Sequence, residues 1–448
     1  MTQIKEQLPD LAMDNLIYRK LSLRLIPILM LGMFISFMDR ANLGVLAGPM
    51  SKDLGLTAAS FGLAAGLFYL GYLVFEIPSN MAMVKFGARK WIARIMVSWG
   101  LVTMLMALIQ NEAMLNILRI MLGVAEAGFS PGVYLLLTFW CPPRILGRAY
   151  ALLHISIPIS LAVATALTST LLFMDGLLGM AGWRWVFLLE GIPAILLGIY
   201  IFLALPDRPK NAKWLTTAEK DYLETQVAHQ PDQAGHEVRH LPAALKSPAV
   251  WVLSFIYFAM TIGFWSITYF LPTIVAERFK TGVIASGFIS AIPWVASVLL
   301  VLIVARLSAK GGGRHWIMLI LLGGAAVGLY MAAATGSPIL ALIGISLGAA
   351  GFNAAIPQFL TMAPQIFVGA TIAISIAMIN SLGNLSGLVG PWLMGIIKDS
   401  TGSVTGGLFI MAGFFVIAAI LSFLMSKYAA RRFAATQKTD PALATTGN

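Results

Sequence analysis

Cysteine and charge are scarce in this 448-residue sequence. The single cysteine, Cys141, excludes an internal disulfide framework and any zinc or iron–sulfur site built from several cysteines. Charged residues make up only 11% and hydrophobic residues 59% of the chain, a balance that excludes an ordinary water-soluble protein. No P-loop sequence is present, so we do not expect ATP to be the energy source.

Long uncharged runs dominate the chain instead. Residues 317–336 carry no charged side chain, and similar runs recur along the sequence. A membrane-spanning helix needs about 20 apolar residues, whereas the strands of a membrane barrel show short alternating segments. The sequence therefore predicts an all-α integral membrane protein with twelve transmembrane helices. Their expected ranges are 23–46, 58–80, 91–110, 114–139, 147–174, 183–205, 248–276, 283–307, 315–334, 338–362, 369–397 and 403–427.

The first apolar run contains Asp39 and Arg40, so we expect a retained helix there and not a cleaved secretory signal. Most Lys and Arg residues fall in segments that twelve spans would place on one side. Because basic residues are retained on the cytoplasmic side, both termini are predicted to face the cytoplasm. The net charge of +11 is then explained by basic residues that face anionic lipid head groups, and no nucleic-acid partner is expected.

The predicted organisation has two groups of six helices. A cytoplasmic tail at 1–22 precedes the first group at 23–205, and a cytoplasmic loop at 206–247 leads to the second group at 248–427, which a cytoplasmic tail at 428–448 follows. In the loop, Thr216 and Glu219 have the spacing of a capping box, which predicts a short surface helix through Val227. Three histidines there have spacings that do not favour a metal site, so we interpret the loop as a polar connector: His229, His236 and His240.

Two short patterns occur in both halves at nearly the same offset. Gly87-Ala-Arg-Lys-Trp91 is similar to Gly312-Gly-Arg-His-Trp316, and Gly128-Phe-Ser-Pro is similar to Gly351-Phe-Asn-Ala. This agreement predicts two parallel six-helix repeats, the architecture of transporters that rock two halves about a central site. Glycines four residues apart also predict close helix contacts, at Gly62/Gly66, Gly344/Gly348 and Gly383/Gly387.

Ionisable residues inside the predicted helices point to function, because a charge at the bilayer centre costs about 2.5–3.5 kcal/mol. Six candidates stand out, and these six all lie in the first half: Asp39, Arg40, Glu76, Arg119, Glu126 and Glu190. Residues 317–397, in contrast, contain no Asp, Glu, Lys, Arg or His. We infer that the first half titrates and that the second half recognises a ligand through neutral hydrogen-bonding groups.

Helical geometry groups these charges. Arg119 and Glu126 are seven residues apart, hence about 20° from the same face, and both can point at one cavity. Asp39 and Arg40 are adjacent, hence about 100° apart, so one can face the cavity and the other an adjoining helix. A buried carboxyl group can bind a proton near neutral pH, and an arginine can hold a carboxylate. The set suits proton-coupled anion movement; static ion pairs that lock the first and fourth helices together are the alternative.

Other candidates are less specific. For Glu190, near the outer end of the sixth helix, we favour a structural role, and Glu76 is open to either interpretation. Tyr72 shares a helix face with Glu76 and either binds a ligand or packs. Gly128-Phe-Ser130-Pro-Gly132 matches the nucleophile elbow of hydrolases, but it lies inside a predicted membrane helix with no histidine placed as its base. We therefore do not expect an enzyme.

Together these motifs resemble the anion:cation symporter family of the major facilitator superfamily, which includes bacterial tartrate, sugar-acid and aromatic-acid permeases. The resemblance spans residues 20–430 and rests on Phe37-Met-Asp39-Arg40-Ala-Asn42, Phe75-Glu-Ile-Pro78-Ser-Asn80, Gly87-Ala-Arg-Lys-Trp91, Arg119-x6-Glu126-Ala-Gly, Glu190-Gly-Ile-Pro193, Asp207-Arg-Pro-x3-Lys213-Trp-Leu215 and Asn380-Ser-Leu-Gly-Asn384 followed by Gly390-Pro391. One departure is that Val84 and Ala309 stand where the superfamily has an acidic residue three positions before Gly87 and Gly312.

The resemblance implies a secondary active transporter that takes up a small organic carboxylate with protons. It implies that Asp39 and Glu126 bind protons, that Arg119 couples to them, and that Arg40 and Tyr72 contact the substrate carboxylate. Neutral residues of the second half would read the rest of the substrate: Tyr257, Asn353, Asn380 and Asn384. We expect a monomer in the inner membrane with no cofactor or metal. Proton-coupled efflux or antiport of a hydrophobic organic molecule is the alternative.

Overall fold

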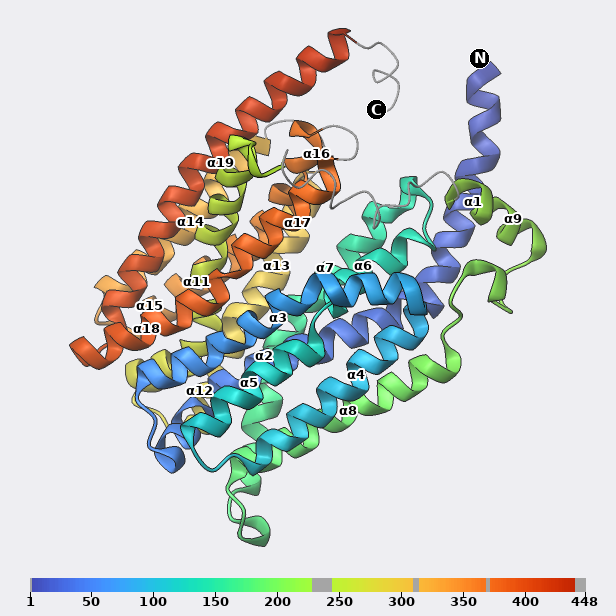
Figure 1. The fold of residues 1–448 in the computed structure, drawn as a ribbon. Helices are drawn as coiled ribbons and strands as arrows, with labels where there is room; N and C mark the ends of the chain where they lie inside the picture. The colour runs from blue at the N-terminus through green and yellow to red at the C-terminus, as the bar shows by residue number, and fades with distance from the viewer. Residues whose placement is uncertain (1, 228–243, 309–313, 368–370, 440–448) are drawn as a thin grey trace. The chain divides into compact units, whose positions relative to one another are not determined.

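The computed structural model describes residues 2–227, 244–308, 314–367 and 371–439. Every regular element in these ranges is a helix (Figure 1). A helix satisfies its backbone hydrogen bonds internally, which is the requirement that lipid imposes on apolar segments. Eleven stretches of the described chain are long and apolar enough to cross a membrane. They comprise α2 (Ile26–Leu54), α3 (Ala58–Phe86), α4 with the 3-10 turn η1 (Ala88–Leu108), α5 (Glu112–Glu126) with α6 (Phe129–Thr138), α7 with η2 (Pro143–Met174), α8 (Gly182–Ala204), α11 (Pro248–Phe279), α12 (Val283–Ile289) with α13 (Ala291–Ser308), α14 (Arg314–Ala334), α15 (Pro338–Leu360) and α19 (Thr405–Thr439).

The eleventh predicted helix, at 369–397, is present as two pieces. Helix α17 (Thr371–Asn384) has 14 residues and α18 (Ser386–Thr401) has 16, with Leu385 between them. Each piece alone is shorter than the about 20 residues of a single span, so neither is a candidate span by itself. The predicted all-α membrane fold is confirmed. Shorter elements are η3 (Leu177–Gly179), η4 (Pro209–Asn211) and α16 (Ala363–Ile366).

Helix α1 (Thr2–Arg24) occupies the segment for which the sequence predicted only a polar tail. Its mixed polar composition lacks the apolar run by which the other helices were found. The predicted surface helix after Thr216 is confirmed as α9 (Thr217–Val227), and the capping box forms: Glu219 N–H donates to Thr216 Oγ1 at 3.3 Å and Thr216 N–H donates to Glu219 Oε2 at 2.8 Å. Lys20 of α1 also pairs with Glu219 at 2.6 Å. The histidines at 229, 236 and 240 lie outside the described residues.

The turn between α3 and α4 has an acidic partner from elsewhere in the chain. Gly87 adopts a φ of +90°, which favours glycine, and Asp207 lies beside it. The Asp207 carboxylate accepts the Arg89 backbone N–H at 3.1 Å and pairs with the Arg89 guanidinium at 3.3 Å. Asp207 thus places a carboxylate near this turn, whereas Val84 stands at the position where the superfamily has an acidic residue. Ala309 and Gly312, at the related turn, lie outside the described residues.

The chain folds as two compact units, each described here by itself. The first unit comprises Met1–Asn42 and Leu70–Ala234, and the second comprises Leu43–Tyr69 and Gly235–Asn448. Helices α2 and α3 therefore each contribute to both units. The assignment of 23–205 and 248–427 to two six-helix bundles stays a prediction.

Close glycine contacts hold the first unit together. Helices α4 and α8 run side by side (Figure 1), and Gly100 of α4 lies against the Gly191 carbonyl of α8. A Cβ on Gly100 would come 2.7 Å from that oxygen, closer than real Cβ atoms approach. Gly191 directly follows Glu190, so this contact fixes the helix that carries the buried carboxyl group.

The predicted glycine pairs also lie at close contacts, all within the second unit. Gly62 and Gly66 of α3 meet the backbone of α18 at Pro391 and Leu388. The other two pairs show the same pattern: Gly344 meets Gly328 and Gly348 meets Leu329 on α14, while Gly383 and Gly387 meet the rings of Tyr257 and Tyr69. The prediction of close packing at these glycines is confirmed.

Candidate functional site

The six ionisable residues predicted inside helices are all buried in the first unit. Each of the six residues is at most 6% exposed: Asp39, Arg40, Glu76, Arg119, Glu126 and Glu190. Burying a charge is costly unless a partner compensates it, so the partners of these groups decide their chemistry.

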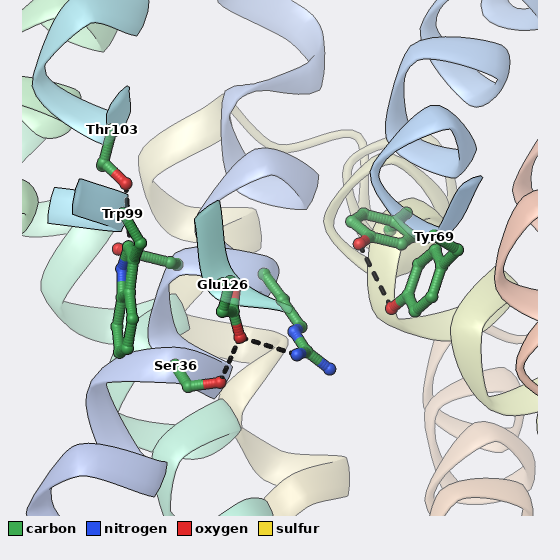
Figure 2. A network of polar contacts seen from close by, with 8 residues as sticks. Ser36, Tyr69, Trp99, Thr103 and Glu126 are labelled. Atoms are coloured by element: carbon green, nitrogen blue, oxygen red, sulfur yellow. Dashed lines mark hydrogen bonds and ion pairs between the residues drawn. The ribbon is translucent and has the colours of Figure 1, made fainter. Parts of the chain in front are cut away.

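Arg40 and Glu126 form a buried ion pair between α2 and α5. Arg40 Nη2 donates to Glu126 Oε1 at 2.6 Å, and the Ser36 hydroxyl donates to the same oxygen at 2.6 Å. Figure 2 shows Ser36 and Glu126 joined in this way. The other oxygen, Glu126 Oε2, is buried and has no hydrogen-bond partner among the residues that the structure describes. Glu126 is fully buried, and its carboxylate is held by one cation and one hydroxyl.

A helix break places Glu126. Helix α5 ends at Glu126, Gly128 adopts a φ of +82°, and α6 begins at Phe129. The Ser79 hydroxyl of α3 donates to the Ala127 carbonyl at 2.6 Å and so satisfies one of the carbonyls that the break releases. A carboxylate at a helix C-terminus is unfavourable toward the helix dipole, which makes the Arg40 partner more important. The sequence predicted one continuous helix at 114–139, because the turn shares its apolar character with the flanking helices.

Asp39 faces a different helix from Arg40. Asp39 Oδ2 accepts from Trp99 Nε1 at 2.5 Å and from the Thr103 hydroxyl at 3.1 Å, both on α4. Figure 2 shows Trp99 and Thr103 close to each other. Asp39 Oδ1 is buried and has no hydrogen-bond partner in the described ranges. Both donors are neutral, so Asp39 lacks the cation that Glu126 has.

Arg40 also contacts two aromatic rings. Its guanidinium carbon lies 5.0 Å from the Phe37 ring centroid and 5.4 Å from that of Tyr72. Cations within about 6 Å of an aromatic centroid are stabilised by the ring quadrupole. Tyr72 of α3 therefore lies beside Arg40, and its contact with a substrate carboxylate stays a prediction. Arg119 is buried on α5 two turns before Glu126, and Glu76 is buried one turn after Tyr72.

Glu190 of α8 lies in a polar pocket of its own. The Asn42 amide of α2 donates to Glu190 Oε2 at 2.6 Å, and the Thr168 hydroxyl of α7 donates to Oε1 at 2.7 Å. Asn42 Oδ1 is buried without a hydrogen-bond partner. Three helices therefore meet at a carboxyl group whose donors are all neutral.

The neutral candidates in the second unit are only partly brought together. Tyr257 of α11 stacks on Phe359 of α15 with centroids 5.4 Å apart, and its ring abuts Gly383 of α17, next to Asn384. Asn353 is buried, and its amide donates to the Ala349 carbonyl of its own helix at 2.9 Å. Asn380 and Asn384 are half-buried on α17.

Sequence reasoning missed an aromatic cluster in the second unit. The ring of Trp265 on α11 lies 4.8 Å from that of Tyr69 and 4.8 Å from that of Phe264, and Phe264 stacks on Phe352 at 4.4 Å. The hydroxyl groups of Tyr69 (Figure 2) and Tyr269 are 3.5 Å apart. Aromatic residues on buried helices resemble ordinary core in a sequence, so no signal separated this cluster from packing.

Sequence reasoning also missed the neutral partners of the buried carboxyl groups. Ser36 lies four residues before Arg40, which places both on one helix face and could have suggested a link. Trp99 and Thr103 share a face by the same rule, and Asn42 was part of a motif without a role. The pairing of each donor with its acceptor depends on helix packing, which the sequence does not encode locally.

Comparison with known proteins adds family information. The profile of the Major Facilitator Superfamily matches residues 29–315 and 253–446. A protein of Agrobacterium vitis named "Putative tartrate transporter" is 40% identical over 411 residues, covering 92% of this chain and 91% of that protein. The "Quinolone resistance transporter" of Acinetobacter baumannii is 36% identical over 412 residues, covering 91% and 94%.

A third relative is the "Inner membrane transport protein RhmT" of Escherichia coli K12, 32% identical over 415 residues and covering 92% of this chain and 96% of that protein. Among solved structures, a bacterial homologue of the human lysosomal transporter Spinster has a TM-score of 0.74 at 19% identity, covering 91% and 97% of the two chains. At this identity the likeness supports the fold alone.

Proposed function

This chain belongs to the major facilitator superfamily of multi-pass membrane transporters, not to an enzyme family, and on that premise we propose that it takes up a small organic carboxylate together with protons. The substrate class includes tartrate, sugar acids and aromatic acids. The name of the Agrobacterium vitis relative supports a carboxylate. The protein acts as a monomer in the inner membrane with both termini in the cytoplasm; the name of the Escherichia coli relative supports the membrane.

The observation that carries this proposal is the buried ion pair of Arg40 and Glu126. Glu126 forms an ion pair with Arg40, whose guanidinium group is also suited to binding a substrate carboxylate. A substrate anion and the Glu126 carboxylate compete for the same cation. When Glu126 takes up a proton it becomes neutral, the ion pair is lost, and Arg40 can bind the substrate. Proton binding and anion binding then favour each other, which is the requirement for symport.

Asp39 provides a second proton site in this proposal. Its donors Trp99 and Thr103 are neutral, so protonation removes the cost of a buried charge without breaking an ion pair. Arg119, on the helix that carries Glu126, couples the two carboxyl groups. For a monoanion and two protons, one net positive charge moves inward per cycle, so each 100 mV of membrane potential contributes about 2.3 kcal/mol.

Neutral groups would recognise the remainder of the substrate. Tyr72 lies against Arg40 and is placed to contact the carboxylate end. In the second unit we assign this role to the other four candidates: Tyr257, Asn353, Asn380 and Asn384. Asn353 would have to release the Ala349 carbonyl to reach a ligand, so it is the member whose side chain must reorient.

Uptake by the reconstituted chain tests the proposal. Proteoliposomes with an imposed inward proton gradient should accumulate radiolabelled carboxylate above the level of vesicles without a gradient. The substrate is selected beforehand from tartrate, sugar acids and hydroxylated aromatic acids, because a ligand that binds the folded state raises the melting temperature. Equal uptake of the carboxylate with and without the proton gradient would contradict symport.

Efflux or antiport of a hydrophobic organic molecule is the second candidate. The name of the Acinetobacter baumannii relative supports it. Two buried arginines, Arg40 and Arg119, disfavour a cationic substrate. The direction of proton-driven movement distinguishes the two, because efflux would remove the molecule from vesicles as protons enter.

A further inference from the structure

Glu190 is a buried carboxyl group that the proposed mechanism does not use. It is 2% exposed, and among the described residues its only hydrogen-bond partners are the neutral groups of Asn42 and Thr168. A packing role would be served by glutamine at less cost, because an amide makes two hydrogen bonds here without a charge to bury. An ionisable residue in this position therefore favours a function that involves ionisation.

The balance of buried charges points the same way. The membrane helices of the first unit bury four carboxyl groups and two guanidinium groups among the described residues. If all were ionised, negative charges would exceed positive charges by two. Glu126 pairs with Arg40, whereas the contacts of Asp39 and Glu190 are all neutral. For Asp39 and Glu190, therefore, a bound proton removes a buried charge without breaking an ion pair among the described residues.

Asp39 and Glu190 are also linked to each other. Asn42, which donates to Glu190, lies one turn after Asp39 on α2. Within the described part of the chain, the buried oxygens Asp39 Oδ1 and Asn42 Oδ1 have no hydrogen-bond partner. These oxygens of α2 can therefore accept a hydrogen bond from a protonated carboxyl group.

Among the described residues, no buried cation of the helices packed around Glu190 compensates its charge. From α2 the nearest charged residues are Asp39 and Arg40, and Arg40 is held by Glu126. On α4, Arg94 lies six residues before Gly100, about 9 Å along the axis from the contact with Gly191. On α8, the Arg184 guanidinium donates to the carbonyls of Ala107 and Ile109. The ionisable residues of α7 lie at least 14 residues before Thr168, about 21 Å along the axis: Arg144, Arg148, Tyr150 and His154.

We propose that Glu190 is a third proton-binding residue of the transport cycle, held by Asn42 and Thr168 and exchanging its proton with Asp39. This inference rests on the proposed symport for its role in transport, but its chemistry can be tested without transport. A proton that leaves Asp39 moves to Glu190, and a proton that leaves Glu190 returns to Asp39 or to water. Only one of the two carboxyl groups then carries an uncompensated charge at a time.

Infrared difference spectra of the full-length protein in lipid nanodiscs, recorded during a pH titration, test the proposal. The carbonyl stretch of a protonated carboxyl group disappears when the group ionises. We expect the wild-type protein to lose one such band that Glu190→Gln lacks. Thr168→Val should keep the band at a changed frequency, because one hydrogen-bond donor is gone. Asp39→Asn should keep it with a midpoint at lower pH, because a neighbouring negative charge has been removed.

Several outcomes would overturn the proposal. Identical titrating bands in wild type and Glu190→Gln would show that Glu190 holds no exchangeable proton. If Glu190→Gln does not fold, Thr168→Val assigns the band, and an unchanged carbonyl frequency in that variant would reject the assignment. An unchanged midpoint in Asp39→Asn would reject the exchange with Asp39.

Transport supplies a separate readout. In proteoliposomes, Glu190→Gln should flatten the pH dependence of substrate exchange, whereas the matched control Glu219→Gln outside the membrane helices should not. A titrating band without proton-driven uptake would mean that the proposed symport fails while Glu190 still binds a proton. Proton-driven uptake with the wild-type pH profile in Glu190→Gln would mean that symport stands and the role of Glu190 fails.

Discussion

The Arg40 guanidinium donates a hydrogen bond from Nη2 to Glu126 Oε1 at 2.6 Å, although the two residues come from different helices and lie 86 positions apart. The ion pair is buried, with side-chain exposures of 8% for Arg40 and 0% for Glu126, so solvent screens it little. An anion that takes the place of Glu126 at Arg40 Nη2 must displace the Glu126 carboxylate, and protonation of that carboxylate removes the competition. This competition allows one proton to control one anion site, and it underlies the predictions that concern transport.

Replacing Arg40 by lysine should weaken substrate binding while keeping the positive charge. Lysine lacks the planar fork that holds a carboxylate, and a hydrogen bond to a charged group contributes about 1.5–3 kcal/mol, so affinity should fall roughly tenfold to a hundredfold. The dissociation constant, measured by titration calorimetry with the selected carboxylate, checks this. Equal affinity in Arg40→Lys would contradict a fork-like contact.

Asp399 stabilises the start of α3 in a pH-dependent manner. Its carboxylate accepts the N–H groups of Ala58 at 3.0 Å and Ala59 at 2.8 Å. Partial desolvation raises the pKa of Asp399, but these hydrogen bonds and those to Thr57 outweigh it and hold the pKa below the usual value. The stabilisation is therefore complete above the ordinary aspartate pKa and is lost as the pH falls through the lowered one.

Asp399→Ala should accordingly lower the melting temperature at neutral pH and not in strong acid. A helix-capping group contributes about 1 kcal/mol, so a modest decrease is expected. Tryptophan fluorescence melts of both proteins over a pH series provide the measurement. A decrease that persists below the lowered pKa would mean that Asp399 acts through packing and not through its charge.

Glu219 joins the surface helix α9 to α1. Desolvation raises the pKa of its carboxyl group, but Lys20 and Thr216 outweigh that effect and hold the pKa below its usual value. Glu219→Ala removes the ion pair and half of the capping box, so α9 should detach and residues near Val227 should be cut faster by protease. The exposed Glu224 gives a control, since Glu224→Ala should leave the digestion rate unchanged.

Gly62 tests the packing of α3 on α18. A Cβ at this position would collide with the Pro391 carbonyl, whereas a Cβ at Gly323 of α14 would meet nothing within 4 Å. Gly62→Val should reduce the yield of folded, monodisperse protein several-fold in size-exclusion chromatography, because backbone atoms cannot move aside. Gly323→Ala should behave as wild type. Similar yields for both variants would contradict the close contact.

The sequence predicted the helices well because their signal is local. Apolar runs bounded by charge located α8 and α15 within two residues at each end, and the spacing of Thr216 and Glu219 located α9. Breaks inside apolar runs were missed, at Gly128 and at Leu385, because turn residues there are as apolar as the helices. In lipid, hydrophobicity separates span from loop and does not mark a bend within a span.

The candidate site was predictable in kind but not in its pairings. Charge scarcity singled out Asp39, Arg40, Glu126 and Glu190, because a buried ionisable residue is rare enough to be conspicuous in a single sequence. Which carboxyl group pairs with Arg40 and which has only neutral donors depends on the rotation of each helix against its neighbours. That rotation results from contacts such as Gly100 with Gly191, which only the folded structure supplies.

Proton-driven accumulation by Glu126→Gln is the most direct test of the account. Glutamine resembles the protonated carboxyl group, so Arg40 would be permanently available to substrate, and no proton would be needed to release it. In proteoliposomes with an inward proton gradient, the account predicts that Glu126→Gln still exchanges the selected carboxylate across the membrane but no longer concentrates it. Accumulation by Glu126→Gln equal to that of the wild-type protein would contradict it.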